Sequence, residues 1–252
     1  MGGVVAVYSM KGGVGKSSLA VNLADAAASA GHRTLLWDVD AQGAAGFLLG
    51  HGERGERGAK DRRAPLAKSI FSRDVDAADV IEVTDLPGLD LIAADLSLRH
   101  IDMALSEDKP KRLRKLLSAL SPDYGRIVLD CPPGLGELSD QIFRAADILV
   151  VPVIPAPLAL RTLDQVRAHL AQERGKKAPD LLPVFSMVDR RKALHREMVA
   201  AHPDWPVIPL ASVIEQMGVK QAPLAHFGPR TAAAQAVSQV WQAVEQALAQ
   251  GG

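Results

Sequence analysis

One stretch decides the fold of this chain: Met10-Lys11-Gly12-Gly13-Val14-Gly15-Lys16-Ser17-Ser18. An apolar run of strand length, residues 4–8, precedes it, and apolar residues at helical spacing follow it as far as Gly31. A glycine-rich loop between a strand and a helix turns its backbone N–H groups toward phosphate oxygens, and the helix adds the positive end of its dipole. The stretch therefore predicts a phosphate-binding loop.

Individual residues of the loop suit separate tasks. The glycines admit backbone conformations that are closed to other residues. We expect Lys16 to reach the β- and γ-phosphates of a nucleotide and the Ser17 hydroxyl to ligate Mg²⁺. A glycine-rich turn that binds nothing is the alternative, and the strand–loop–helix context disfavours it. The predicted nucleotide-binding residues of the loop are Lys11, Gly12, Gly13, Val14, Gly15, Lys16, Ser17 and Ser18.

Continuous apolar runs alternate with helical patterns along the rest of the chain. The predicted strands are residues 34–37, 89–93, 127–129, 148–153, 182–188 and 207–210. The predicted helices include residues 110–120, 158–172, 191–201 and 232–249. Strands that are apolar throughout indicate a parallel sheet covered on both faces. We therefore predict one α/β domain over residues 1–252, with a doubly wound, mostly parallel sheet and ligands at the carboxyl ends of its strands.

Composition excludes several classes of protein. The 252 residues are 48% hydrophobic, which is ample for a core, and the 29 basic and 29 acidic residues give a net charge of +0. Contact with nucleic acid would therefore need a local basic patch. The single cysteine, Cys131, excludes a disulfide framework. No apolar run is long enough to cross a bilayer, so we expect a cytoplasmic protein. The charged, glycine-rich segment 52–63 favours a mobile loop over a partner-binding element.

The loop departs from the standard pattern G-x-x-x-x-G-K-[ST], because Met10 replaces its first glycine and Lys11 follows. This combination is the deviant Walker A motif, and the chain resembles the ParA/MinD family of P-loop ATPases. The resemblance implies ATP and Mg²⁺ as ligands, slow ATP hydrolysis stimulated by a protein partner, and a homodimer in the ATP state. It also implies that Lys11 crosses the dimer interface to the nucleotide of the other subunit.

Two further segments carry the resemblance. Residues 37–43, Trp37-Asp38-Val39-Asp40-Ala41-Gln42-Gly43, are similar to the family segment D-x-D-P-Q-G. Residues 126–136 are similar to its Walker B stretch, I-I-I-D-C-P-P-S-L-G. An aspartate at the end of a buried strand suits a Mg²⁺ site. The resemblance implies that Asp40 positions the attacking water and acts with Lys11 and Lys16, and that Ser17, Asp38 and Asp130 surround the metal.

Weaker matches lie toward the carboxyl terminus. Residues 151–160 resemble the segment V-P-V-Q-P-E-Y-L-A-L of the ParA branch. Residues 187–191 are similar to M-F-D-A-R, which lies near the adenine in relatives, and this implies base contacts by Met187 and Asp189. Pro209 matches the other wall of the base pocket.

Two functions stay open at this stage. One is a partitioning or positioning ATPase that binds nucleoid DNA without sequence preference. Its candidate DNA contacts are Arg190, Arg191, Lys192 and Lys220, although the arginines that follow the Ile-Pro pair in the ParA branch are absent. The other is a nucleotide-switched regulator of a protein partner, such as an envelope or polysaccharide-synthesis machine, without DNA binding. Residues 231–252 contain no Lys or Arg, which favours a helix packed on the core over a membrane-binding one.

Overall fold

The structure is a computed structural model that describes residues 2–51, 69–72, 77–101, 105, 111–173 and 178–250. The segment 52–63, for which a mobile charged loop is predicted, lies outside these residues.

The described strands form one eight-stranded sheet in the order β3-β4-β2-β5-β1-β6-β7-β8. The strands are β1 (Gly3–Val7), β2 (Thr34–Asp38), β3 (Glu82–Val83), β4 (Leu89–Ile92), β5 (Arg126–Asp130), β6 (Ile148–Val153), β7 (Asp180–Val188) and β8 (Val207–Pro209). All neighbouring strands pair in parallel except β3, which is antiparallel to β4 at the edge. The predicted mostly parallel sheet is confirmed, and β3 is an addition, because two residues are too short for an apolar pattern.

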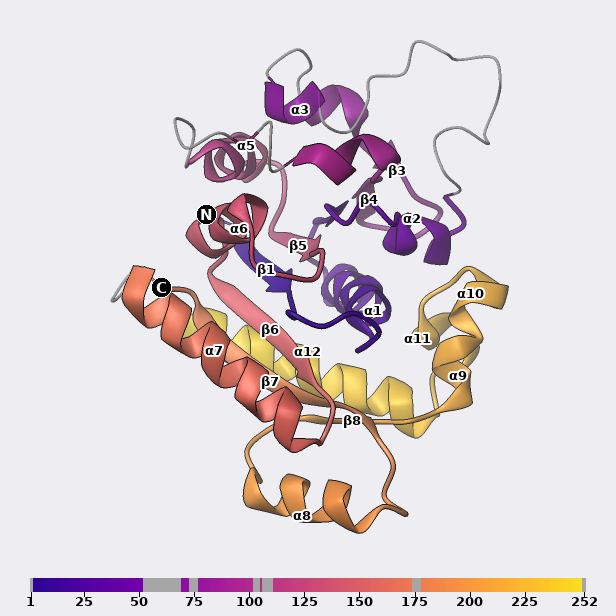
Figure 1. Cartoon of the computed structure of the whole chain (residues 1–252). Helices are drawn as coiled ribbons and strands as arrows, with labels where there is room; N and C mark the ends of the chain where they lie inside the picture. Colours follow the sequence, from indigo (N-terminus) through magenta and orange to yellow (C-terminus); the bar gives the residue numbers. More distant parts are fainter. Residues whose placement is uncertain are drawn as a thin grey trace.

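Helices cover both faces of the sheet. In β1, Val4 and Ala6 face one apolar cluster whereas Val5 and Val7 face the other. The first cluster contains α5 (Arg112–Leu120), α6 (Glu137–Ala145) and α7 (Pro157–Glu173), and the second contains α1 (Lys16–Ser29) and α12 (Ala232–Gln250). In Figure 1, α7 lies in front of β6 and β7 while α12 passes behind them. The doubly wound arrangement is thereby confirmed.

Shorter helices connect these elements. They are α2 (Ala44–Leu48), α3 (Ser69–Ser72), the 3-10 helices η1 (Ala77–Val80) and η2 (Leu96–His100), α8 (Ala193–Ala201), α9 (Ser212–Glu215), α10 (Met217–Lys220) and α11 (Leu224–Phe227). The helix predicted from residue 191 begins two residues later, at Ala193. The Asp189 carboxylate accepts the backbone N–H of Arg191 at 3.0 Å, and this turn delays the helix.

The last long helix packs on the core. Ala236, Val240 and Val244 of α12 are buried, and α12 packs against α1 and β8. The expectation of a core-packed terminal helix is therefore confirmed. Within the described ranges, no helix has both the length and the apolar character that a membrane span needs.

Candidate functional site

The phosphate loop joins β1 to α1 through two left-handed glycines. Gly13 has φ +72° and Gly15, at the amino end of α1, has φ +85°, a region that favours glycine. No described side chain caps α1. The first N–H groups of a helix have no partner within the helix, so those of α1 are available to an anion. The local backbone thus has the form of an anion-binding site.

The loop is open on its outer face and holds its lysine inward. A Cβ atom added at Gly12 or Gly13 would meet no atom within 4 Å. Lys16 is 7% exposed, and its Nζ donates to the carbonyl oxygen of Lys11 at 3.4 Å. A single long bond to its own loop leaves the Lys16 ammonium able to turn to a stronger acceptor, such as a phosphate.

Strand β7 supports the phosphate loop through a residue that sequence reasoning missed. The Ser186 Oγ donates to the carbonyl oxygen of Val14 at 2.8 Å, in a buried position. The next residue, Met187, has φ +54°, and its methyl group lies near Gly15. The sequence shows Ser186 as a polar residue within an apolar run. It does not show that the serine contacts Val14, because that contact depends on the order of the strands in the sheet.

Two buried aspartates end neighbouring strands. Asp38 of β2 and Asp130 of β5 are opposite each other in register, and both are fully buried. Asp38 Oδ1 accepts the N–H of Asp40 at 3.1 Å, and Oδ2 accepts those of Ala45 and Gly46 at 3.0 and 3.4 Å. Burial, followed by the charge of Asp130, raises the pKa of Asp38. The Asp38 carboxyl therefore holds the loop after β2 and the start of α2.

Asp130 differs from Asp38 in its contacts. Both of its carboxylate oxygens are buried and have no hydrogen-bond partner among the described residues. Burial raises the pKa of Asp130 to about 7, although the Ser17 hydroxyl and the Lys16 ammonium oppose this shift. A buried carboxylate without partners is costly, and a hard cation such as Mg²⁺ would compensate it. The Asp130 and Ser17 oxygens are thus a donor set that suits Mg²⁺.

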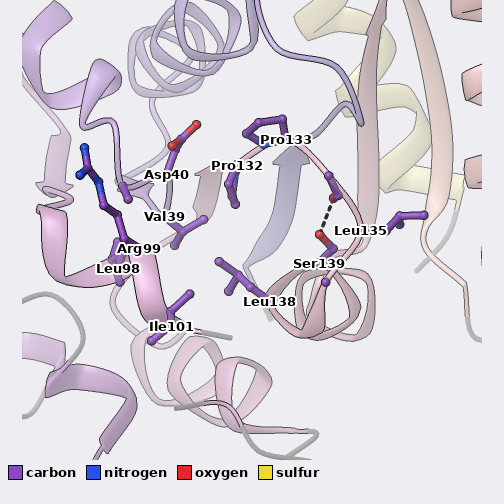
Figure 2. Close-up of a pocket in the computed structure, with 13 residues that line it drawn as sticks. Val39, Asp40, Leu98, Arg99, Ile101, Pro132, Pro133, Leu135, Leu138 and Ser139 are labelled. Carbon is purple, nitrogen blue, oxygen red and sulfur yellow. Dashed lines mark hydrogen bonds between the residues drawn. The ribbon is translucent and has the colours of Figure 1, made fainter. Parts of the chain in front are cut away.

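Asp40 lies where the loop after β2 meets the loop after β5. It is half-buried, and its Oδ1 accepts the N–H of Gln42 at 3.0 Å. Together the two loops line a cavity of about 190 Å³. Figure 2 shows Asp40 and Arg99 on one side of this cavity, and Pro132 and Pro133 on the other. A movement of either loop would change the surroundings of Asp40.

The residues predicted to contact the base lie together. Val188 of β7 pairs with Pro209 of β8, so Met187, Asp189 and Pro209 lie at adjacent strand ends. Asp189 accepts two bonds of 2.9 Å from the Arg191 guanidinium, which lowers the pKa of Asp189 to about 2. Its backbone N–H donates to the Nδ1 of the buried His195 at 3.0 Å. These contacts fix the end of β7.

Comparison with known proteins decides the family. A family model described as an AAA domain matches residues 2–181. The chromosome partitioning protein ParA of Caulobacter vibrioides is 34% identical over 209 residues, covering 79% of this chain and 76% of that protein. This chain belongs to the ParA/MinD family of P-loop ATPases. The family that the loop motif indicates is thereby confirmed.

Two other ParA/MinD proteins extend the comparison. The sporulation initiation inhibitor protein Soj of Bacillus subtilis is 32% identical over 207 residues, covering 79% of this chain and 78% of Soj. The structure of the septum site-determining protein MinD from Pyrococcus horikoshii, complexed with Mg-ADP, has a TM-score of 0.78. It is 20% identical and covers 100% of this chain and 99% of MinD, and this likeness shows a shared fold.

The cations considered for DNA binding in this ParA/MinD protein do not form one patch. Arg191 is paired with Asp189, and the Arg196 guanidinium donates to the carbonyl oxygens of Arg190 and Arg191 at 2.9 and 3.0 Å. Lys220 ends α10, which packs against α2. Figure 1 shows α8 at one end of the molecule and α10 at another side. Lys220 therefore lies apart from the loop that precedes α8.

Proposed function

We propose that this chain is an ATP-dependent dimerising switch that hydrolyses ATP slowly with Mg²⁺ and serves intracellular partitioning or positioning. One observation carries the proposal. The unpartnered, buried carboxylate of Asp130 lies close to Ser17, at the mouth of an open phosphate loop. The names of the relatives support the cellular role, since ParA of Caulobacter vibrioides is a chromosome partitioning protein.

Each residue of the site then has a task. The N–H groups of the loop and the Lys16 ammonium bind the terminal phosphates. Asp130 and Ser17 hold Mg²⁺, which when bound supplies positive charge to the phosphate oxygens. Asp40, half-buried at the junction of two loops, positions the attacking water. Asp38 keeps the Asp40 loop in place through the three backbone bonds it accepts.

The resemblance to the ParA/MinD family supports the proposed dimer, and the charge that phosphoryl transfer requires agrees with it. Catalysis of this reaction rests on positioning and on compensating the charge of the transferred group. Lys16 of one subunit supplies one cation, and the family resemblance assigns the other to Lys11 of a second subunit. Hydrolysis is therefore slow in a single subunit, which lacks the second cation. It is also slow while the loops around Asp40 are incompletely ordered. A protein partner that orders the loops around Asp40 accelerates hydrolysis.

Non-specific DNA is the proposed surface to which the ATP-bound dimer attaches. Net charge is +0, so the contact is local. The exposed loop before α8, which carries Arg190 and Lys192, is the candidate surface. Pairing of two subunits presents this loop twice, and nucleotide-dependent attachment would place the protein on the nucleoid.

The experiment that tests nucleotide binding is a titration with ATP in the presence of Mg²⁺. Lys16→Ala removes the ammonium that lies inside the phosphate loop, so the affinity for ATP should fall at least about 100-fold. Lys192→Ala removes an exposed lysine outside this loop and serves as the matched control, with affinity unchanged. Equal affinity of Lys16→Ala and wild type would reject the proposed site.

A further inference from the structure

The loop that follows Asp130 is attached to the last residue of β1, Val7, and to the residue after it, Tyr8. The N–H of Cys131 donates to the carbonyl oxygen of Val7 at 3.2 Å. The hydroxyl of Tyr8, which follows Val7 in the chain, donates to the carbonyl oxygen of Gly134 at 2.8 Å. Tyr8 leads directly into the phosphate loop, so these bonds join the two loops that surround the proposed nucleotide site.

A second hydroxyl donates to the same carbonyl. The Ser139 Oγ of α6 donates to the Gly134 oxygen, also at 2.8 Å (Figure 2). Gly134 has φ +97°, a conformation that favours glycine. The Walker B stretch of the family, I-I-I-D-C-P-P-S-L-G, has serine at the position of Gly134, so this chain differs from the family pattern here. Two donors on one carbonyl satisfy both of its lone pairs and fix its direction.

The surroundings of Tyr8 keep its hydroxyl protonated and directed toward the Gly134 carbonyl. Tyr8 is fully buried, and its ring contacts Phe143 of α6 edge to face, with centroids 4.9 Å apart and an interplanar angle of 88°. Burial raises the pKa of Tyr8, so the hydroxyl keeps its proton. An aromatic ring held by packing on one side presents its hydroxyl in one direction.

The attached loop forms a wall of the cavity beneath Asp40. Gly134 and Ser139 line this cavity together with Pro132 and Pro133, and Asp40 lies across it. A shift of the Gly134 carbonyl therefore moves the wall that faces Asp40. The phosphate loop itself is held elsewhere, by Ser186.

We propose that Tyr8 is a positioning residue for hydrolysis: with Ser139 it clamps the Gly134 carbonyl and so fixes residues 131–136 against the phosphate loop. The inference rests on the proposed ATPase function. It assigns the clamp to the hydrolytic step rather than to nucleotide binding, because neither hydroxyl belongs to the proposed phosphate-binding set.

The test compares two tyrosine variants. Tyr8→Phe keeps the ring and removes the hydroxyl. Tyr124→Phe is the matched control, because Tyr124 is also buried and its hydroxyl donates to Asp90 Oδ2 at 2.7 Å, outside the loops of the site. A net hydrogen bond corresponds to a factor of about 2–10, so Tyr8→Phe should lower kcat about threefold or more, with KM for ATP within about twofold. Tyr124→Phe should lower thermal stability and leave kcat unchanged.

A double variant tests the shared acceptor. Ser139→Ala alone leaves one donor on the Gly134 carbonyl, whereas Tyr8→Phe with Ser139→Ala leaves none. The loss of kcat in the double variant should exceed the product of the two single losses. Ser139→Thr keeps a hydroxyl and should retain the wild-type kcat.

The outcomes separate the inference from the proposed function. If the wild type hydrolyses ATP while Tyr8→Phe and Tyr124→Phe both lose only stability, the clamp has no role in hydrolysis and the inference is overturned. If the losses of the double variant are simply multiplicative, the shared-carbonyl argument is overturned. If the wild type neither binds nor hydrolyses ATP, the proposed function fails, and the inference fails with it.

Discussion

Asp38 and Asp130 end adjacent strands at the same level of the sheet, yet their oxygens have different surroundings. The Asp38 carboxyl accepts three backbone N–H groups, and both Asp130 oxygens have no partner within the described part of the chain. An unpartnered buried charge lowers stability in exchange for a ligand-binding position. Asp130 is therefore the residue at which stability and activity should oppose each other.

Replacing Asp130 with asparagine should stabilise the metal-free protein. At pH 8, above the pKa of about 7, the native carboxyl is charged, and Asp130→Asn should raise the free energy of unfolding by about 1–3 kcal/mol. Because folding raises this pKa from 3.8 to about 7, stability is lost as pH rises from about 4 to about 7 and the loss is complete above pH 7, so the gain from Asp130→Asn should be smaller at pH 5. Urea denaturation with a chelator measures both values. Asp40→Asn, at a half-buried site, should change stability less, and equal gains in the two variants would contradict the account.

The sequence predicts that Asp38 and Asp130 end buried strands, but it does not separate their roles. Two of the three partners of Asp38, Ala45 and Gly46, lie in α2, a five-residue helix with no readable apolar period. Likewise His195, which holds the N–H of Asp189, looks like an ordinary polar residue of an exposed helix until its burial is known. Contacts between a side chain and a distant backbone group require the three-dimensional arrangement.

Strand β7 and the phosphate loop form a unit at the scale of elements. The Ser186 hydroxyl is the described contact that ties the Val14 carbonyl to the sheet. Since a net hydrogen bond corresponds to a factor of about 2–10 in affinity, Ser186→Ala should weaken ATP binding about fivefold.

The matched control for Ser186→Ala is Ser238→Ala, which removes a bond of 3.2 Å from Ser238 to the Ala234 carbonyl within α12. Isothermal titration with Mg-ATP measures both variants, and only Ser186→Ala should lose affinity. Unchanged affinity in Ser186→Ala would show that the loop holds its shape without β7. The apolar run of β7 is readable in the sequence, but the pairing that brings Ser186 to Val14 is not.

The charge of the whole molecule limits how it can meet DNA. With net charge +0 and Arg191 already paired to Asp189, few cations of each subunit face phosphates at once. Non-specific DNA binding should therefore be weak per subunit. The logarithm of the binding constant should fall with the logarithm of the salt concentration, with a slope of roughly 0.9 per phosphate contact. An ATP-bound dimer doubles the contacts and roughly doubles the slope.

A gel-shift series over salt concentration, with and without ATP, measures this slope. The variant Arg190→Ala/Lys192→Ala should lower both the affinity and the slope, whereas Lys220→Ala, in another part of the molecule, should lower them less. Binding that ignores ATP and survives the double substitution would reject the loop before α8 as the surface. No binding at low salt would favour a switch that acts on a protein partner.

The ATP-dependent dimer is the central claim, and its mass tests it most directly. Asp40→Ala should bind ATP without hydrolysing it, so light scattering with Mg-ATP should give twice the 26.8 kDa of one chain. Lys11→Ala should bind ATP and keep the mass of one chain, because the cation that reaches the second site is missing. A mass of one chain for Asp40→Ala at saturating ATP would contradict the dimerising switch.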